Sequence, residues 1–148
     1  MTNARILQLT NNTIGAVATN TNLPLGTTTV IYPFDVNNCY PTYTVQSSNS
    51  DTLVVNKSGV YNFVYNASIE SVAAGNVIVE LIVNGTTKYT VTETVAAANS
   101  FVNLTIPFEI YIPNNCASVP NNIPSYIQVK NTGVALVSGT SNLIISKE

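Results

Sequence analysis

The sequence contains no histidine and no tryptophan, and charged residues make up only 8% of its 148 positions. Without histidine the chain cannot build a Ser-His-Asp or Cys-His nucleophile system. It also cannot build the histidine-ligated metal sites found in enzymes, and it carries no glycine-rich phosphate loop. These absences argue against an enzyme, and we expect no catalytic residue, no cofactor and no metal ion.

Basic residues are scarce as well, with five Lys and Arg against seven Asp and Glu and a net charge of −2. They are scattered, so no basic patch is available to displace counterions from phosphates. No apolar run approaches the roughly 18 residues of a membrane helix. The first twelve residues also lack the apolar block of a signal peptide. We therefore expect neither nucleic acid nor a membrane among the partners.

The seven acidic residues are spread along the chain. A carboxylate pair for glycoside hydrolysis could form only through folding, for example between Glu80 and Glu93. Solvated surface acids, or pairing with Lys88, explain the same residues more simply.

The two cysteines, Cys39 and Cys116, lie far apart in the sequence. They could form one disulfide that closes a long loop. They could equally be two thiols packed as small hydrophobic side chains, and assembly in a cytoplasm favours the reduced form. The sequence leaves both states open.

Alternation of apolar and polar residues is what the chain has in abundance. In residues 60–69, Tyr61, Phe63 and Tyr65 fall on one face with Ala67 and Ile69, while smaller or polar residues fall on the other. A period of two is typical of a strand, because successive side chains point to opposite sides of a sheet. The aromatic face is predicted to lie in the core.

A hairpin is predicted where Asn84-Gly85 separates Val77–Val83 from Thr86–Val95, because a type I′ turn requires positive φ at both central residues. Its first strand is apolar on both faces, with Ile78 and Ile82 opposite the valines. A sandwich strand usually exposes one face to water, so the second apolar face needs another layer. With no helix available, we expect another subunit to supply that layer.

The longest alternation runs from Val102 to Ile112 and includes Phe108. Pro107 lies inside it and cannot donate to a ladder, which places it at a sheet edge or a bulge. No segment has a helical period of 3.6. Eight or more short strands with turns at this spacing predict an all-β, antiparallel two-sheet sandwich, a jelly roll, over residues 23–148.

Residues 1–22 have a different character, with one short apolar patch between polar, loop-like stretches. We interpret them as an N-terminal docking arm whose contacts would be Arg5, Ile6, Leu7 and Leu9. The alternative is a frayed terminus.

Several segments resemble one known family. The segment Val54–Phe63 resembles the x-x-G-x-Y-x-F segment of the C1q/TNF-like jelly rolls, and Glu80–Gly85 is similar to their L-x-x-N-G hairpin. Tyr126–Gly133 and Ser141–Lys147 are similar to their last two strands. The resemblance covers residues 30–148 and implies a compact homotrimer with a non-enzymatic role in display, attachment or adhesion. Tyr61, Phe63, Tyr65, Ile78, Ile82 and Phe108 are then the expected core or trimer-facing residues.

The nearly uncharged, amide-rich and hydroxyl-rich composition is typical of an extracellular protein, yet no export signal precedes it. Phage lysis is one route out that needs no such signal. We therefore expect a capsid decoration or head-fibre protein on a virion surface, assembled in the bacterial cytoplasm, with itself and capsid or other virion proteins as partners. The alternatives are a receptor-binding or adhesin head that recognises host-surface glycans, and a spore-surface protein.

Overall fold

The computed structural model of the chain describes residues 5–31, 43–45, 51–55, 59–112 and 125–147. Within these ranges the chain forms eleven strands and no helix. The strands are β1 Arg5–Ile14, β2 Thr21–Asn22, β3 Thr27–Ile31, β4 Tyr43–Val45, β5 Leu53–Val55, β6 Gly59–Ser71, β7 Gly75–Val83, β8 Thr86–Val95, β9 Phe101–Ile112, β10 Ser125–Asn131 and β11 Leu136–Lys147. Cys39 and Cys116 lie outside the described residues.

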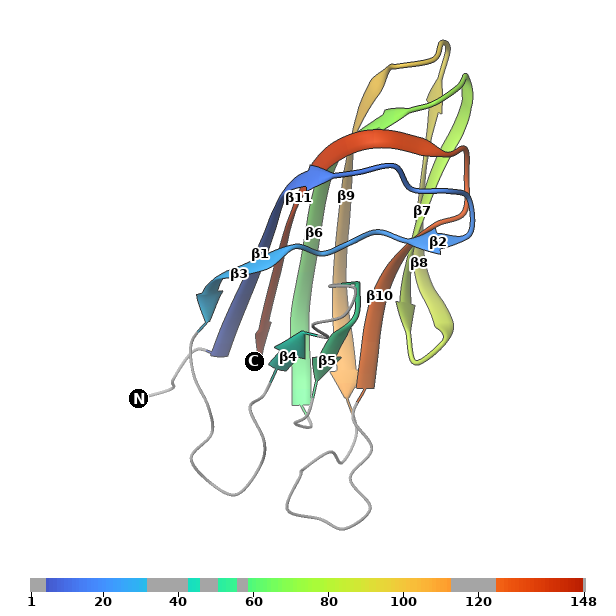
Figure 1. Cartoon of the computed structure of the whole chain (residues 1–148). Helices are drawn as coiled ribbons and strands as arrows, with labels where there is room; N and C mark the ends of the chain where they lie inside the picture. Colours follow the sequence, from blue (N-terminus) through green and yellow to red (C-terminus); the bar gives the residue numbers. More distant parts are fainter. Residues whose placement is uncertain (1–4, 32–42, 46–50, 56–58, 113–124, 148) are drawn as a thin grey trace.

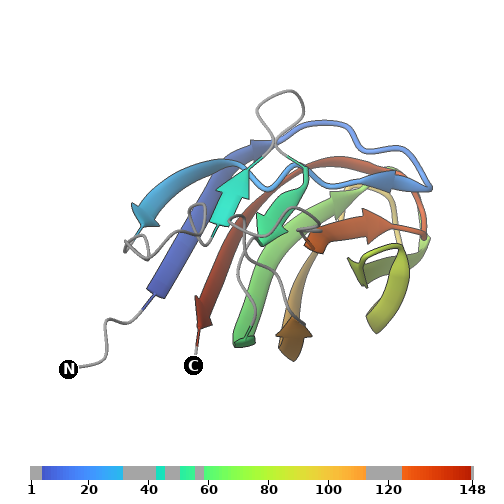
Figure 2. The ribbon, with the colours of Figure 1, turned by 90° about the horizontal axis from the view of Figure 1, so that it is seen from below.

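The strands build two sheets that face each other (Figure 1). One sheet has the order β3-β1-β11-β6-β9, and Figure 2 shows its last four strands side by side. The other has the order β4-β5-β10-β7-β8, with the short β2 also paired to β10. All of these pairings are antiparallel. The predicted all-β, two-sheet antiparallel sandwich is confirmed.

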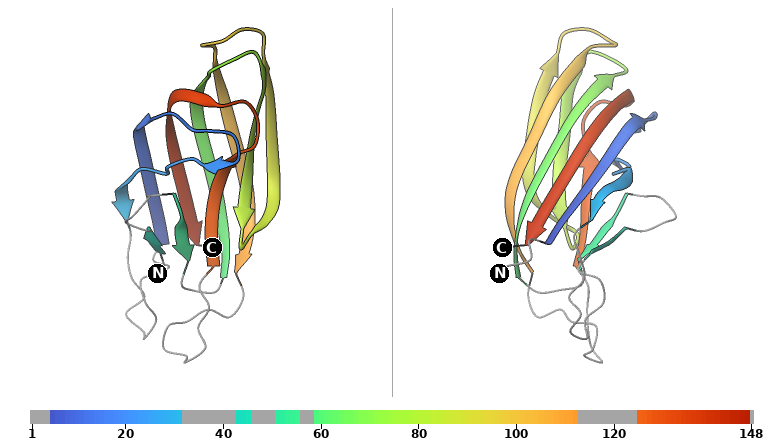
Figure 3. Two further views of the ribbon diagram at one scale, coloured as in Figure 1. Left: turned by 45° about the vertical axis from the view of Figure 1, so that its right-hand side comes forward. Right: turned by 90° about the vertical axis from the view of Figure 1, so that its left-hand side faces the viewer.

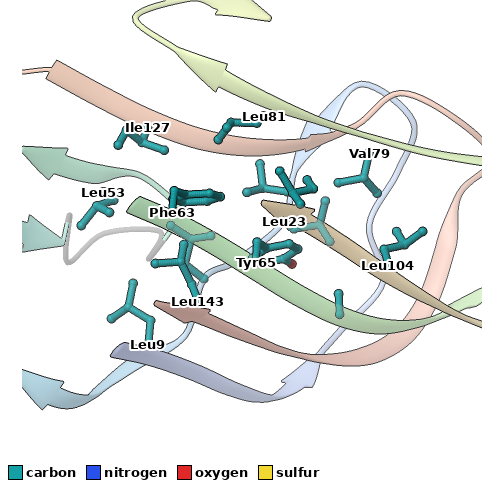
Figure 4. Packing of buried hydrophobic residues seen from close by; sticks show 14 of the residues in the cluster. Leu9, Leu23, Leu53, Phe63, Tyr65, Val79, Leu81, Leu104, Ile127 and Leu143 are labelled. Atoms are coloured by element: carbon teal, nitrogen blue, oxygen red, sulfur yellow. The ribbon is translucent and has the colours of Figure 1, made fainter. Parts of the chain in front are cut away.

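The core lies between the two sheets (Figure 4). On β6, Tyr61, Phe63 and Tyr65 are completely buried, whereas Asn62 and Asn66 on the opposite face of the strand are exposed. Leu81 and Ile127 from the opposite sheet lie across from them (Figure 4). The period-two pattern therefore separates a buried face of β6 from a more exposed face, as predicted, because one face of the pleated strand packs against the opposite sheet.

The predicted hairpin is also confirmed. Strands β7 and β8 are paired along their length, from Gly75 opposite Val95 to Val83 opposite Thr86. The register shifts once, between Leu81 and Ile82. Asn84 and Gly85 have φ values of 51° and 81°, the positive values that a type I′ turn requires. The turn is also fastened to β10, because the Tyr126 amide donates to Asn84 Oδ1 at 2.8 Å.

The N-terminal segment differs from the prediction of an arm. Strand β1 is an interior strand between β3 and β11, and Leu7 and Leu9 are 1% and 0% exposed. These leucines alternate with Gln8 and Thr10, so residues 5–10 have the amphipathic pattern of a strand. Pairing with β1 also covers the edge of β11 that would otherwise be open. The sandwich therefore begins at β1 rather than at residue 23, and Leu7 and Leu9 are core residues rather than docking contacts.

The start of β1 and the end of β11 lie at one end of the sandwich, and the β6–β7 and β8–β9 connections lie at the opposite end (Figure 3). Strand β9 is the last strand of its sheet, so Pro107 occupies an edge as predicted.

Candidate interaction surfaces

Phe108 and Tyr89 close the sandwich along one side. Tyr89 lies on β8 and Phe108 on β9, which are the terminal strands of the two sheets. The two aromatic rings meet edge to face, with their centroids 6.2 Å apart and an angle of 64° between the ring planes. Phe108 is half-buried and packs against the core. It is thus a core-facing residue, one of the two roles expected for it.

Ile78 and Ile82 lie on the outer face of the six-stranded sheet, opposite the buried Val77, Val79 and Leu81. Both isoleucines are half-buried within one copy of the chain. The outer face of β7 is therefore mixed rather than apolar, because Glu80 stands between the two isoleucines on the same face. Much of each isoleucine is also already covered within one copy of the chain.

Glu80 and Glu93 do not form the carboxylate pair considered for glycoside hydrolysis. In the hairpin, Glu80 stands opposite Thr90 and Glu93 stands opposite Val77. Residues 77 and 80 point to opposite sides of their strand, so the two carboxylates lie on different faces of the sheet. Among the described residues there is also no group of three metal-ligating His, Cys, Asp or Glu side chains. The same part of the chain has no helix long and apolar enough to cross a membrane.

Two neighbouring rows of paired residues cross the outer face of the five-stranded sheet. In the first, Ile144, Val64 and Pro107 are directly paired across β11, β6 and β9, and Gln8 of β1 stands beside Ile144. Two residues along each strand, away from the end where β1 starts, the second row consists of Thr10, Asn142, Asn66 and Thr105. On the other side of the first row, toward the end where β1 starts, Ser146, Asn62 and Glu109 are paired. We call the first row the apolar row and the second the amide row.

The amide row lines an open groove of about 430 Å³, the β6 groove. Its carboxamides are held in place: Asn142 Oδ1 accepts from Gln8 Nε2 at 3.0 Å, and Asn66 Oδ1 accepts from Thr105 Oγ1 at 2.9 Å. No charged residue lines this groove. Its remaining side chains offer hydroxyl and amide groups only, apart from Ala67 and Leu104.

A second groove, of about 550 Å³, lies on the six-stranded sheet, and we call it the β10 groove. It is lined by Asn20, Thr21, Asn22, Asp51, Ile82, Gly85, Gln128 and Lys130. Unlike the β6 groove it contains a carboxylate and an ammonium group. No sequence motif points to it, because its residues come from four separate segments that approach one another only through strand pairing.

The order of the strands and their antiparallel pairing define a jelly-roll sandwich, and comparison with solved structures places it in the C1q/TNF-like class of that fold. No family model matches the sequence, and no curated protein matches it either.

Three solved structures share the fold over almost their whole length. Eiger TNF from S. frugiperda superposes with a TM-score of 0.70 at 12% identity, covering 98% of this chain and 91% of that chain. PRD1 vertex protein P5 has a TM-score of 0.61 at 20% identity, with 97% and 95% covered. The globular domain of the zebrafish complement 1qA protein has a TM-score of 0.63 at 9% identity, with 95% of each chain covered. The predicted C1q/TNF-like jelly-roll fold is thereby confirmed.

Proposed function

We propose that the chain is a non-enzymatic structural protein of a phage virion, a homotrimeric capsid decoration or head-fibre component. The observation that carries this proposal is the likeness to PRD1 vertex protein P5, which extends over nearly all of both chains. The surface chemistry agrees with it, because the described outer faces bear mostly amides and hydroxyls and few charges.

The homotrimer is supported by the apolar row. Val64 and Ile144 are half-buried aliphatic side chains on an outer sheet face, flanked by the edge residue Pro107. Covering them with another copy would remove apolar surface from water at about 25 cal/mol per Å². Three is the number of copies that the C1q/TNF-like resemblance implies. Ile78 and Ile82, on the opposite sheet, are the second candidates for this contact.

Residues 5–14 are a strand of the sandwich, so this segment itself is not free to serve as a docking arm. We place the shell contact at the end of the molecule where β1 starts. Arg5 and Ile6 remain candidates there, whereas Leu7 and Leu9 belong to the core. This arrangement turns the β6–β7 and β8–β9 connections away from the particle (Figure 3).

Antibody labelling of purified particles tests the proposal. Particles from the lysate of the producing bacterium should carry gold label on the shell when examined by electron microscopy. Label at the tail tip alone would contradict a shell protein and favour the receptor-binding alternative. Label on spores, with none on phage particles, would overturn the virion assignment altogether.

A further inference from the structure

The β10 groove exists because two strands that are distant in sequence share one edge of β10. Strand β5 pairs with the first part of β10, where Leu53 stands opposite Ile127. Strand β2 pairs with the last part of β10, where Asn22 stands opposite Lys130 (Figure 1). Between these two ladders, the residues just before β5 meet the end of β2. Asp51 and Asn22 are brought together there, 29 positions apart in the chain.

A chain of hydrogen bonds holds the polar groups of the groove. Asn22 Nδ2 donates to Asp51 Oδ2 at 3.3 Å, and Thr52 Oγ1 donates to Asp51 Oδ1 at 3.1 Å. Gln128 Nε2 in turn donates to Thr52 Oγ1 at 3.0 Å. Thr52 is only 3% exposed, so the network is anchored on a buried side chain.

The described hydrogen bonds leave part of the hydrogen-bonding capacity of these groove residues unused. Each carboxylate oxygen of Asp51 accepts one described bond, and a carboxylate has about four acceptor positions. The amides of Asn22 and Gln128 use their NH₂ groups in the network, which leaves their carbonyl oxygens as acceptors. Lys130 adds donors to the same groove.

The lining of the groove carries one charge of each sign, Asp51 and Lys130. Their effects on a bound ion oppose each other, so the lining offers no net attraction to a cation or an anion. A neutral ligand rich in hydroxyl groups satisfies both, because each hydroxyl can donate to an acceptor and accept from a donor.

Two apolar contacts narrow the ligand class further. Ile82 stands directly across from Gln128 and offers an aliphatic surface within the groove. Tyr126 is 41% exposed and lies on the same face of β10 as Gln128, two residues or about 7 Å along the strand. An exposed aromatic ring beside a polar groove suits the C–H face of a pyranose.

We propose that the β10 groove is a binding site for a neutral oligosaccharide, with Asp51 and Gln128 as hydrogen-bonding residues and Tyr126 as a stacking residue. The groove lies on the six-stranded sheet, so self-association through the apolar row leaves it open. The inference deepens the recognition role considered for this fold, but it does not depend on the protein being part of a virion.

A glycan array that carries neutral, sialylated and sulfated oligosaccharides tests the proposal with the full-length protein. We expect binding to a subset of the neutral probes, with dissociation constants then measured by calorimetry. Gln128→Ala and Tyr126→Ala should each weaken that binding by about two- to tenfold, the loss expected for one hydrogen bond or one stacking contact. Asp51→Asn should weaken it while preserving the shape of the side chain.

Thr105→Ala, in the β6 groove, is the matched control and should leave the affinity unchanged. Thermal melts of every variant verify folding, and Tyr126→Ala provides the test should Asp51→Asn prove unstable. The proposal is overturned if no neutral probe binds at millimolar concentration, if only charged probes bind, or if Thr105→Ala alone abolishes binding. Each of these results is independent of where the protein is found on particles.

Discussion

At the scale of single residues, Tyr65 places a phenol in the centre of the core (Figure 4). Burial raises its pKa well above the ordinary value, and the neighbouring Ser141 hydroxyl offsets this only in part. The two oxygens do not reach hydrogen-bond geometry, and neither has a partner among the described residues. The core therefore holds this phenol in its neutral form.

Because of this raised pKa, the free energy of unfolding depends on pH in the alkaline range. The unfolded chain releases the Tyr65 proton at a pKa of about 10, whereas the folded chain retains it, so the free energy of unfolding falls as the pH rises above about 10. Tyr65→Phe should reduce that fall. At pH 7 it should change the free energy of unfolding by less than about 1 kcal/mol, since no hydrogen bond is lost.

Urea unfolding at pH 7 and pH 11 measures both effects. Tyr111→Phe, at a tyrosine that is 70% exposed, is the control and should retain the wild-type pH dependence. A loss of several kcal/mol at pH 7 in Tyr65→Phe would mean that the hydroxyl is well paired, contrary to the geometry described above.

At the scale of elements, β1 decides whether the sandwich can form without its N-terminal segment. It is the strand between β3 and β11, and it contributes Leu7, Leu9 and Ile14 to the core. Loss of one large buried side chain typically costs 2–5 kcal/mol, against a total stability of about 5–15 kcal/mol for a domain. Deletion of residues 1–14 should therefore unfold the protein.

Circular dichroism and a thermal melt check this expectation. Deletion of residues 1–4 alone removes nothing from β1 and serves as the control, for which we expect a cooperative transition close to that of the full chain. A shortened protein from residue 15 onward that melts cooperatively at the wild-type temperature would restore the docking-arm interpretation.

At the scale of the whole molecule, the two outer sheet faces offer two ways to self-associate. We expect light scattering to give three times the chain mass of 15.8 kDa for the wild-type protein. Ile144→Glu, in the apolar row, should give a folded monomer, because assembly would bury an unpaired charge. Thr92→Glu, at an exposed position of β8, should remain trimeric.

Ile78→Glu distinguishes the two faces. Dissociation caused by this variant and not by Ile144→Glu would place the interface on β7 instead of the apolar row. A wild-type protein that remains monomeric at high micromolar concentration would contradict self-association altogether.

The predictions that succeeded depended on local patterns. The alternation around Phe63, the Asn84-Gly85 turn and the edge position of Pro107 follow from pleating, φ preference and the missing amide of proline, all of which act within a few residues. The arm failed as a prediction because it was judged from its polar surroundings, although Leu7 and Leu9 already alternate with polar residues.

The sequence by itself determined that the chain forms strands, which face of β6 is buried, and that no histidine-based chemistry is available, because each depends on residue type and near neighbours. Only the tertiary structure decided that β1 is interior, and that Asp51, Asn22 and Gln128 share one groove. Those outcomes depend on which strand edges pair across long stretches of chain, as in the bond from Gln8 to Asn142 that links residues 134 positions apart. The free energy of such pairing comes from the assembled sandwich as a whole, and no single segment encodes it.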